Sequence, residues 1–124
     1  MARVEVDFNV PLKNVHGKPI ELTTEEDKEE GVKRYFTVGH VIANPLWGTW
    51  QGDERSAQVR RNDAKLVLEM TEDEYNYKVL SLTDKQRKHL KDIVGELVKE
   101  AGYYMQIIEV LGFAPEETEE DDED

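Results

Sequence analysis

The most regular segment of the chain runs from residue 83 to residue 98 and reads TDKQRKHLKDIVGELV. Thr83 and Gln86 have the spacing of a capping box, in which two side chains satisfy free backbone N–H groups at the start of a helix. Apolar residues then recur at three- and four-residue steps, the spacing of one helix face, at Leu90, Ile93, Val94, Leu97, Val98 and Ala101. The pattern predicts an amphipathic helix that supplies a large share of the core.

A second apolar run follows and predicts a last helix, with side chains at Tyr104, Met105, Ile107, Ile108 and Leu111. Gly102 marks the place where the preceding helix would end or bend. Gly112 suits the left-handed position that follows many helices, and Pro115 prevents the helix from resuming.

The N-terminal segment has the two-residue period of a strand with one buried face, with apolar residues at Val4, Val6, Phe8 and Val10. Asn14 and Gly17 supply turn chemistry, and residues 19–22 resume an extended pattern, so we expect a β-hairpin. Thr23 and Glu26 have capping-box spacing, but residues 25–31 offer no apolar face. We expect a charged loop there, with room for one helical turn.

Two helices are expected in the middle of the chain. Thr37 is a candidate N-cap for residues 38–44, which Pro45 would end. Asp53 is a candidate N-cap for a helix that reaches about Met70. The predicted fold class is therefore α+β, with an N-terminal β-hairpin packed on three to four helices. We expect one domain at residues 1–114 and a disordered acidic tail at residues 115–124.

The acidity of the chain is concentrated at one end. The net charge is −12, and eight of the nine residues from Glu116 to Asp124 are acidic. Without these eight, 20 acids face 16 bases. Blocks of like charge repel themselves and stay disordered. This distribution weakens the case for a rigid surface that imitates DNA, which would need carboxylates held on folded elements.

The residue types exclude several chemistries. The chain has no cysteine, which rules out disulfides, thiolate zinc sites and a cysteine nucleophile. His16, His40 and His89 lie in no paired ligand spacing, and the chain contains no Walker A, GxGxxG or GxSxG motif. We therefore expect no catalytic residues, no cofactor and no metal. No apolar run approaches the roughly 20 residues of a membrane span, and the N-terminus lacks a signal sequence, so a cytoplasmic protein is expected.

Two aromatic groups are candidates for a partner surface. Trp47 and Trp50 lie in a glycine-bearing stretch outside the periodic elements, and tryptophan is enriched among the residues that dominate protein interfaces. The alternative is that one or both rings cover the core. Tyr103 and Tyr104 in the last helix could serve a homo-oligomer as readily as a core.

The densest basic cluster suggests a second surface, formed by Lys85, Arg87, Lys88 and Lys91. It could contact nucleic-acid phosphates, with Arg60, Arg61 and Lys65 adding to the patch. An ordinary solvated helix face is the competing interpretation, because the chain has no basic excess. A third alternative is an acidic inhibitor that competes with DNA through carboxylates of the body, such as those from Glu25 to Glu30, as well as those of the tail.

The order of several short motifs resembles a group of small proteins encoded by tailed bacteriophages and prophages. The resemblance covers roughly residues 4–111, and it implies no catalytic residues. Its motifs are Val6-Asp7-Phe8-Asn9, Gly17-Lys18-Pro19-Ile20, Thr37 to Asn44, Asn62 to Met70, Leu80-Ser81-Leu82-Thr83 and Lys91 to Gly95. The Ala114-Pro115 ending with its acidic tail is also similar to the tail-assembly chaperones of long-tailed phages. The longer Glu25–Gly31 loop, the tryptophan loop and the tail depart from the first group.

The resemblance and the residues together predict a non-enzymatic module that binds a protein partner. The phage likeness implies a virion component handled during tail assembly, as by a chaperone, or a host protein that the chain modulates or inhibits in the host cytoplasm. The nucleic-acid module and the acidic DNA mimic remain the alternatives.

Overall fold

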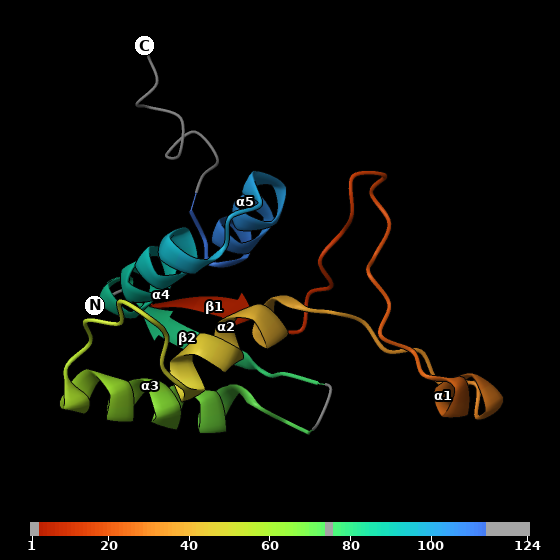
Figure 1. Ribbon diagram of the computed structural model, residues 1–124, viewed down its shortest axis with the longest axis horizontal. Helices are drawn as coiled ribbons and strands as arrows, with labels where there is room; N and C mark the ends of the chain where they lie inside the picture. The colour runs from red at the N-terminus through yellow and green to blue at the C-terminus, as the bar shows by residue number, and fades with distance from the viewer. Residues whose placement is uncertain (1–2, 74–75, 114–124) are drawn as a thin grey trace, which may run out of the picture. The chain divides into compact units, whose positions relative to one another are not determined.

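The computed structural model describes residues 3–73 and 76–113, and within these ranges the chain forms two strands and five helices (Figure 1). The elements follow the order β1 (Arg3–Asp7), α1 (Glu25–Glu29), α2 (Val38–Trp47), α3 (Ala57–Met70), β2 (Val79–Thr83), α4 (Asp84–Leu97) and α5 (Ala101–Val110). The α+β class is confirmed. The helix beyond the predicted four is the five-residue α1, which lies in the segment expected to be a charged loop with room for one helical turn.

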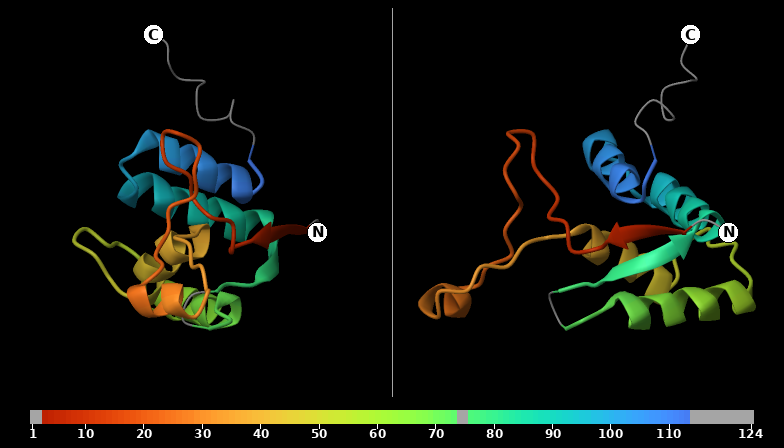
Figure 2. Two further views of the ribbon diagram at one scale, coloured as in Figure 1. Left: turned by 90° about the vertical axis from the view of Figure 1, so that its right-hand side faces the viewer. Right: turned by 180° about the vertical axis from the view of Figure 1, so that it is seen from behind.

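The described residues group into two compact units, the first of which contains residues 3–6 and 81–113. In this unit β1 pairs with β2 in a two-stranded sheet, and the arrows of Figure 2 run in opposite directions. Strand β1 therefore takes its partner from a distant part of the sequence. The Arg3 guanidinium adds a hydrogen bond of 2.9 Å to the Ser81 carbonyl.

Helices α4 and α5 form the rest of the first unit. The predicted capping box is present, because the Thr83 hydroxyl accepts from the Gln86 N–H at 3.2 Å and the Gln86 amide oxygen accepts from the Thr83 N–H at 2.9 Å. The predicted α4 stripe is buried at Leu90, Ile93 and Val94. Other buried apolar side chains of this unit are Val6, Leu82, Ile107, Ile108 and Leu111.

The break between α4 and α5 lies earlier than predicted. Helix α4 ends at Leu97, because Val98 adopts an extended backbone, and α5 begins at Ala101 with Glu100 as its N-cap. The two helices pack against each other. Ala101 is therefore exposed at the start of α5 instead of extending the α4 face. Gly112 has the predicted left-handed conformation, with φ at 96°.

The second unit contains residues 7–73 and 76–80. Its N-terminal part holds the predicted hairpin turn, in which Lys13 bridges Pro19 in antiparallel register and Gly17 has φ of 76°. Further antiparallel bridges join Pro11 to Thr37 and Glu21 to Tyr35. These pairings form an arm with α1 at its far end (Figure 1).

Helix α1 begins with a capping box that lies one residue later than the predicted one. The Thr24 hydroxyl accepts from the Asp27 N–H, and the Asp27 carboxylate accepts from the Thr24 N–H, both at 3.1 Å. The Arg34 guanidinium then donates to the same carboxylate at 2.9 Å. Asp27 is buried, and its ion pair with Arg34 ties the helical turn to the segment that returns along the arm.

Helices α2 and α3 pack side by side in the second unit (Figure 1). Thr37 is the N-cap of α2, as predicted. The N-cap of α3 is Ser56, whose hydroxyl accepts from the Val59 N–H at 3.1 Å, and not Asp53. Buried apolar side chains of this unit are Phe8, Leu12, Val38, Ile42, Ala43, Leu46, Val67 and Met70.

Among residues 3–73 and 76–113, no helix is both long and apolar enough to cross a membrane. The predicted disordered tail at residues 115–124 lies outside the described residues. The predicted single domain at residues 1–114 stays a prediction.

Candidate functional site

Helix α2 continues past the proline that was expected to end it. Pro45 lies inside the helix, which runs to Trp47. A proline removes one backbone donor, but the next donors remain available, and the Gly48 N–H closes the last turn on the Asn44 carbonyl at 3.1 Å. The extension of α2 places Trp47 in the final turn of a helix and not in a loop.

The carbonyl groups at this helix end are satisfied by the side chain of Arg55. Its Nη2 donates to the carbonyl oxygens of Gly48 at 2.7 Å and Pro45 at 3.2 Å. Its Nη1 lies 3.5 Å from the Leu46 carbonyl oxygen. The last carbonyls of a helix lack partners within the helix, and a cation there also complements the helix dipole. Arg55 therefore acts as a C-terminal cap for α2 that is supplied from outside the helix.

Two carboxylates hold Arg55 in this position. Asp53 accepts from Nε at 2.9 Å and from Nη2 at 2.8 Å, and Asp63 accepts from Nη1 at 2.9 Å. The three side chains are 5–6% exposed. A planar guanidinium presents five donors in a fixed fork, which lets one side chain join α2, the connecting loop and α3. We call this set of contacts the Arg55 clasp, formed by Arg55, Asp53, Asp63 and the carbonyls of residues 45, 46 and 48.

The electrostatics of the clasp favour its charged form. The hydrogen bond from Arg55 is the largest cause that lowers the pKa of Asp53, from the usual 3.8 to about 2. The same hydrogen bond raises the pKa of Arg55 further above its already high value. Both groups are therefore ionised over the physiological pH range, and the Asp53 carboxylate serves as a structural anion.

The two tryptophan side chains near the clasp differ in how far they are exposed to solvent. The Arg55 guanidinium lies 4.4 Å from the centroid of the Trp50 ring, within the range of a cation–π contact. Trp50 is half-buried and covers the clasp. The Trp47 side chain is 60% exposed, although it stands beside the buried Leu46 and the carbonyls that Arg55 binds. Of the two predicted contact residues, Trp50 thus packs against the protein's own Arg55, and Trp47 presents its ring to solvent.

Tyr103 and Tyr104 lie in the first turn of α5 in the other unit, and both are half-buried. The Tyr104 ring packs on α4 beside Gly95. A Cβ atom added at Gly95 would lie 3.6 Å from Cε1 of Tyr104. Burial raises the pKa of the Tyr104 phenol, and the nearby Asp92 charge adds to the rise. Tyr104 therefore helps to hold the two helices together.

The predicted basic cluster on α4 is divided by the structure. Arg87 is 8% exposed, donates to the Leu111 carbonyl at 3.0 Å and pairs with Asp84. Lys91 is half-buried, with its ammonium 4.6 Å from the centroid of the Phe113 ring. Lys85 and Lys88 are exposed. Arg87 thus joins α4 to the end of α5 and is not part of an exposed basic surface.

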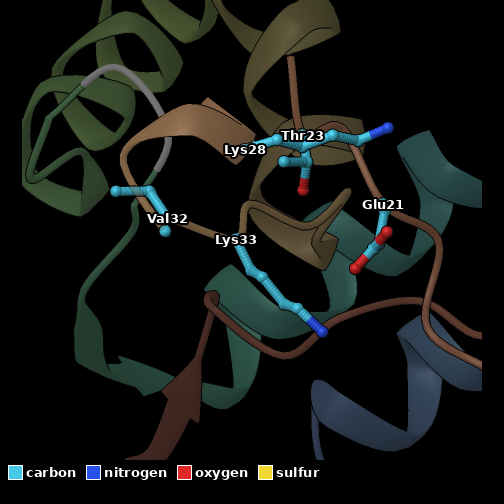
Figure 3. Close-up of a pocket in the computed structure, with 6 residues that line it drawn as sticks. Glu21, Thr23, Lys28, Val32 and Lys33 are labelled. Carbon is cyan, nitrogen blue, oxygen red and sulfur yellow. The ribbon is translucent and has the colours of Figure 1, made fainter. Parts of the chain in front are cut away.

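The arm of the second unit carries a shallow pocket of about 240 Å³ (Figure 3). Such a volume is smaller than that of typical small-molecule sites. Glu21 and Lys33 extend toward the same side of it, while the Lys28 ammonium points away. The Thr23 hydroxyl accepts from the Arg34 N–H at 3.1 Å. The pocket therefore brings together surface charges and a hydroxyl that already has a structural role.

His40 is bound to its own helix start. Its Nδ1 accepts from the Thr37 N–H at 3.1 Å and lies 2.9 Å from the Thr37 hydroxyl oxygen. Burial lowers the pKa of His40 below its usual 6.5, so the neutral ring is favoured. Among the described residues, no group of three or more His, Asp or Glu side chains is arranged to hold a metal ion.

Sequence reasoning missed Arg55, the residue on which the site depends. A single arginine between Asp53 and Ser56 looks like an ordinary loop cation. The available signal was the density of turn residues around it, Gly48, Gly52 and Asp53, which indicates a structured loop in need of internal hydrogen bonds. No comparison of the chain with protein-family models, curated proteins or solved structures gave a match.

Proposed function

We propose that this chain is a non-enzymatic module that binds a protein partner through a surface centred on Trp47. The observation that carries the proposal is a large aromatic ring, 60% exposed, at a helix end that a buried arginine holds in place. Exposed apolar residues are common on proteins. An indole on a clasped helix end differs from most of them because its backbone is fixed.

Two physical features support a binding role for this ring. Tryptophan offers a large contact area with few rotatable bonds, so little side-chain entropy is lost when a partner covers it. The clasp orders the loop before any partner arrives, which reduces the cost of association. A ring in this setting suits an anchor that fills a pocket on another protein.

The polar groups near the site favour binding over chemistry. The carboxylates of Asp53 and Asp63 are paired with Arg55. General acid–base catalysis needs a group with a pKa near the working pH, and Arg55 lowers the pKa of Asp53. The chemistry of this region is therefore that of a rigid support.

The resemblance to small proteins of tailed bacteriophages gives the proposal a context. The partner would be a virion component kept soluble during tail assembly or a host protein whose activity the chain modifies. Both partners would be recognised in the same way, through an apolar pocket that accepts the Trp47 indole.

The experiment is an affinity capture with matched variants. Full-length wild-type protein, Trp47→Ala and Leu68→Ala are immobilised and exposed to bacterial lysate, with and without tailed-phage proteins. Leu68 is the matched control because it is another exposed apolar side chain, 65% exposed and on α3. We expect one protein to be retained by wild type and Leu68→Ala and lost from Trp47→Ala. Identical retention by all three folded proteins would contradict the proposal.

A further inference from the structure

Helix α5 carries little charge for a helix that is open to solvent on one side. Glu109 is the one charged side chain among its ten residues, although 35% of the whole chain is charged. Its buried residues are Ile107 and Ile108, and α4 packs against it (Figure 1). A helix that is apolar on every side is normally covered on every side. The open side of α5 is therefore a candidate contact surface.

The residues of this open side are aligned along the helix. Gly102, Met105 and Glu109 are exposed, and their steps of three and four residues place them on one face, opposite Ile107 and Ile108. The Met105 side chain, in the middle, is 44% exposed. We call these three residues the α5 open face.

Gly102 has no role in the packing of its own chain. It does not have a positive φ, and a Cβ atom added to it would meet nothing within 4 Å. Glycine weakens a helix relative to alanine, so a glycine without a conformational or packing reason is unfavourable. Glycine is used where another group must approach the backbone closely. The open space above Gly102 is suited to a side chain from outside the chain.

The charges at the two ends of the α5 open face are opposite and unpaired. Among residues 3–73 and 76–113, neither Glu109 nor Lys99 forms an ion pair, and the Lys99 ammonium donates to the Glu96 carbonyl at 3.0 Å. Glu109 lies in the last turn of α5, where the helix dipole disfavours an acid. Lys99 is exposed just before the helix begins. The other acid at this end, Glu100, is the N-cap of α5, where an acid is favoured.

These features complement one another when two copies of α5 pack antiparallel about a two-fold axis. In such a contact, each residue pair occurs twice. An axis midway between Gly102 and Met105 places Met105 over Gly102 of the partner subunit. Glu109 lies four residues after Met105, and Lys99 lies three residues before Gly102. The same register therefore brings Glu109 toward Lys99 of the partner subunit, near the positive end of the partner's helix dipole.

We infer that two copies of this chain form a dimer through their α5 open faces, with Met105 packed on Gly102 and Glu109 paired with Lys99 across the two-fold axis. The occupant is a second copy because both the space and the charges of the face find their complements on an identical face. A helix of ten residues is about 15 Å long, so the contact is smaller than that of a permanent dimer and dissociates on dilution. This activity goes beyond protein binding at Trp47.

The test is sedimentation velocity of the full-length protein at low salt, from roughly 5 to 500 µM, where a weak dimer forms and dissociates. Wild type should change from monomer to dimer over this range. Lys99→Glu and Glu109→Lys should each weaken dimerisation roughly tenfold or more, because two symmetric attractions become repulsions. The double variant restores both pairs at the wild-type net charge and should dimerise as wild type does.

Two further variants control for net charge and for folding. Lys85→Glu makes the same charge change as Lys99→Glu at an exposed site on α4 and should leave dimerisation unchanged. Gly102→Gln fills the open space with a neutral side chain that favours a helix. It should keep the wild-type circular dichroism spectrum and remain monomeric over the same range.

Several outcomes would overturn the inference. One is a wild-type protein that stays monomeric at the highest concentration. Another is a double variant that dimerises no better than the two single variants. A folded Gly102→Gln variant that dimerises as wild type does would exclude the close approach of the helices. Loss of the dimer in Trp47→Ala would assign it to a different surface, whereas retention by Trp47→Ala keeps this inference separate from the protein-binding proposal.

Discussion

At the scale of single residues, the structure depends most on the geometry of one guanidinium. Arg55 binds two carboxylates and the carbonyl oxygens at the end of α2 at the same time. Lysine carries the same charge, but its donors radiate from one nitrogen atom. It cannot reach both sides of this network.

We therefore predict that Arg55→Lys destabilises the protein by about 1 to 3 kcal/mol, because carbonyl and carboxylate acceptors lose their partners in a buried setting. Urea unfolding followed by tryptophan fluorescence measures the change. Arg61→Lys, at an exposed position of α3, should stay within about 0.5 kcal/mol of wild type. Equal unfolding midpoints for the two variants would show that charge alone holds the clasp.

His40 predicts a pH dependence of stability whose sign follows from its burial. Burial lowers the folded-state pKa below 6.5, so between the two pKa values the unfolded chain binds more protons than the folded one. The stability conferred by the neutral ring is complete above the unfolded pKa and is lost as the pH falls from about 6.5 through the folded pKa. Protonation of Nδ1 also removes the acceptor for the Thr37 N–H.

His40→Asn separates this effect from the titration of the carboxylates, because the amide oxygen can accept a hydrogen bond but does not titrate. Free energies of unfolding are measured from about pH 7.5 to pH 5.5. Wild type should lose more stability than His40→Asn over this interval. Parallel curves would mean that His40 titrates alike in the folded and unfolded chains.

Arg87 shows what the sequence could have predicted at this scale. It precedes Leu90 by three residues and Val94 by seven, so helical periodicity already places it on the buried face of α4. The high charge density of residues 85–91 instead favoured a surface interpretation. Arg55 offers no comparable periodicity, because its partners come from a helix end, a loop and a second helix.

At the scale of the elements, two glycines make a matched pair. A Cβ on Gly39 in α2 would lie 2.3 Å from Cγ of Tyr77, whereas a Cβ on Gly95 in α4 would meet its nearest neighbour, the Tyr104 ring, at 3.6 Å. The first distance requires the ring or the helix to move. The second is an ordinary van der Waals contact.

Gly39→Ala should therefore cost about 1 to 3 kcal/mol through overpacking. Gly95→Ala should stabilise the protein by up to about 1 kcal/mol, because alanine favours the interior of a helix. Thermal or urea unfolding of both variants measures the difference. A Gly39→Ala variant as stable as Gly95→Ala would contradict the close packing of Tyr77 on α2.

The elements were predictable where local signals were strong. The Thr83 capping box and the α4 stripe follow from side-chain type and spacing alone. The end of α2 was placed too early, because proline is a local stop signal and the compensating cap comes from Arg55, which lies ten residues further along the chain. The α4–α5 break was placed too late, because residues 98–100 carry no glycine or proline and the helices turn to pack on each other.

At the scale of the whole molecule, the α+β class followed from the two kinds of periodicity. The partner of β1 did not, because the pairing with β2 joins segments far apart in sequence and requires the intervening chain to fold. The candidate binding surface was harder to predict than the strand pairing. Trp47 was predicted as a contact residue from its type and surroundings, but its exposure and the cover role of Trp50 depend on where the Arg55 clasp ends α2.

The most direct measurement is the dissociation constant of the captured partner for wild-type protein, Trp47→Ala and Leu68→Ala by isothermal titration calorimetry. An interface anchor is worth about 2 kcal/mol or more, so Trp47→Ala should weaken binding by at least about 30-fold. Leu68→Ala should bind as wild type does. A folded Trp47→Ala variant with wild-type affinity would show that the partner contacts another part of the chain.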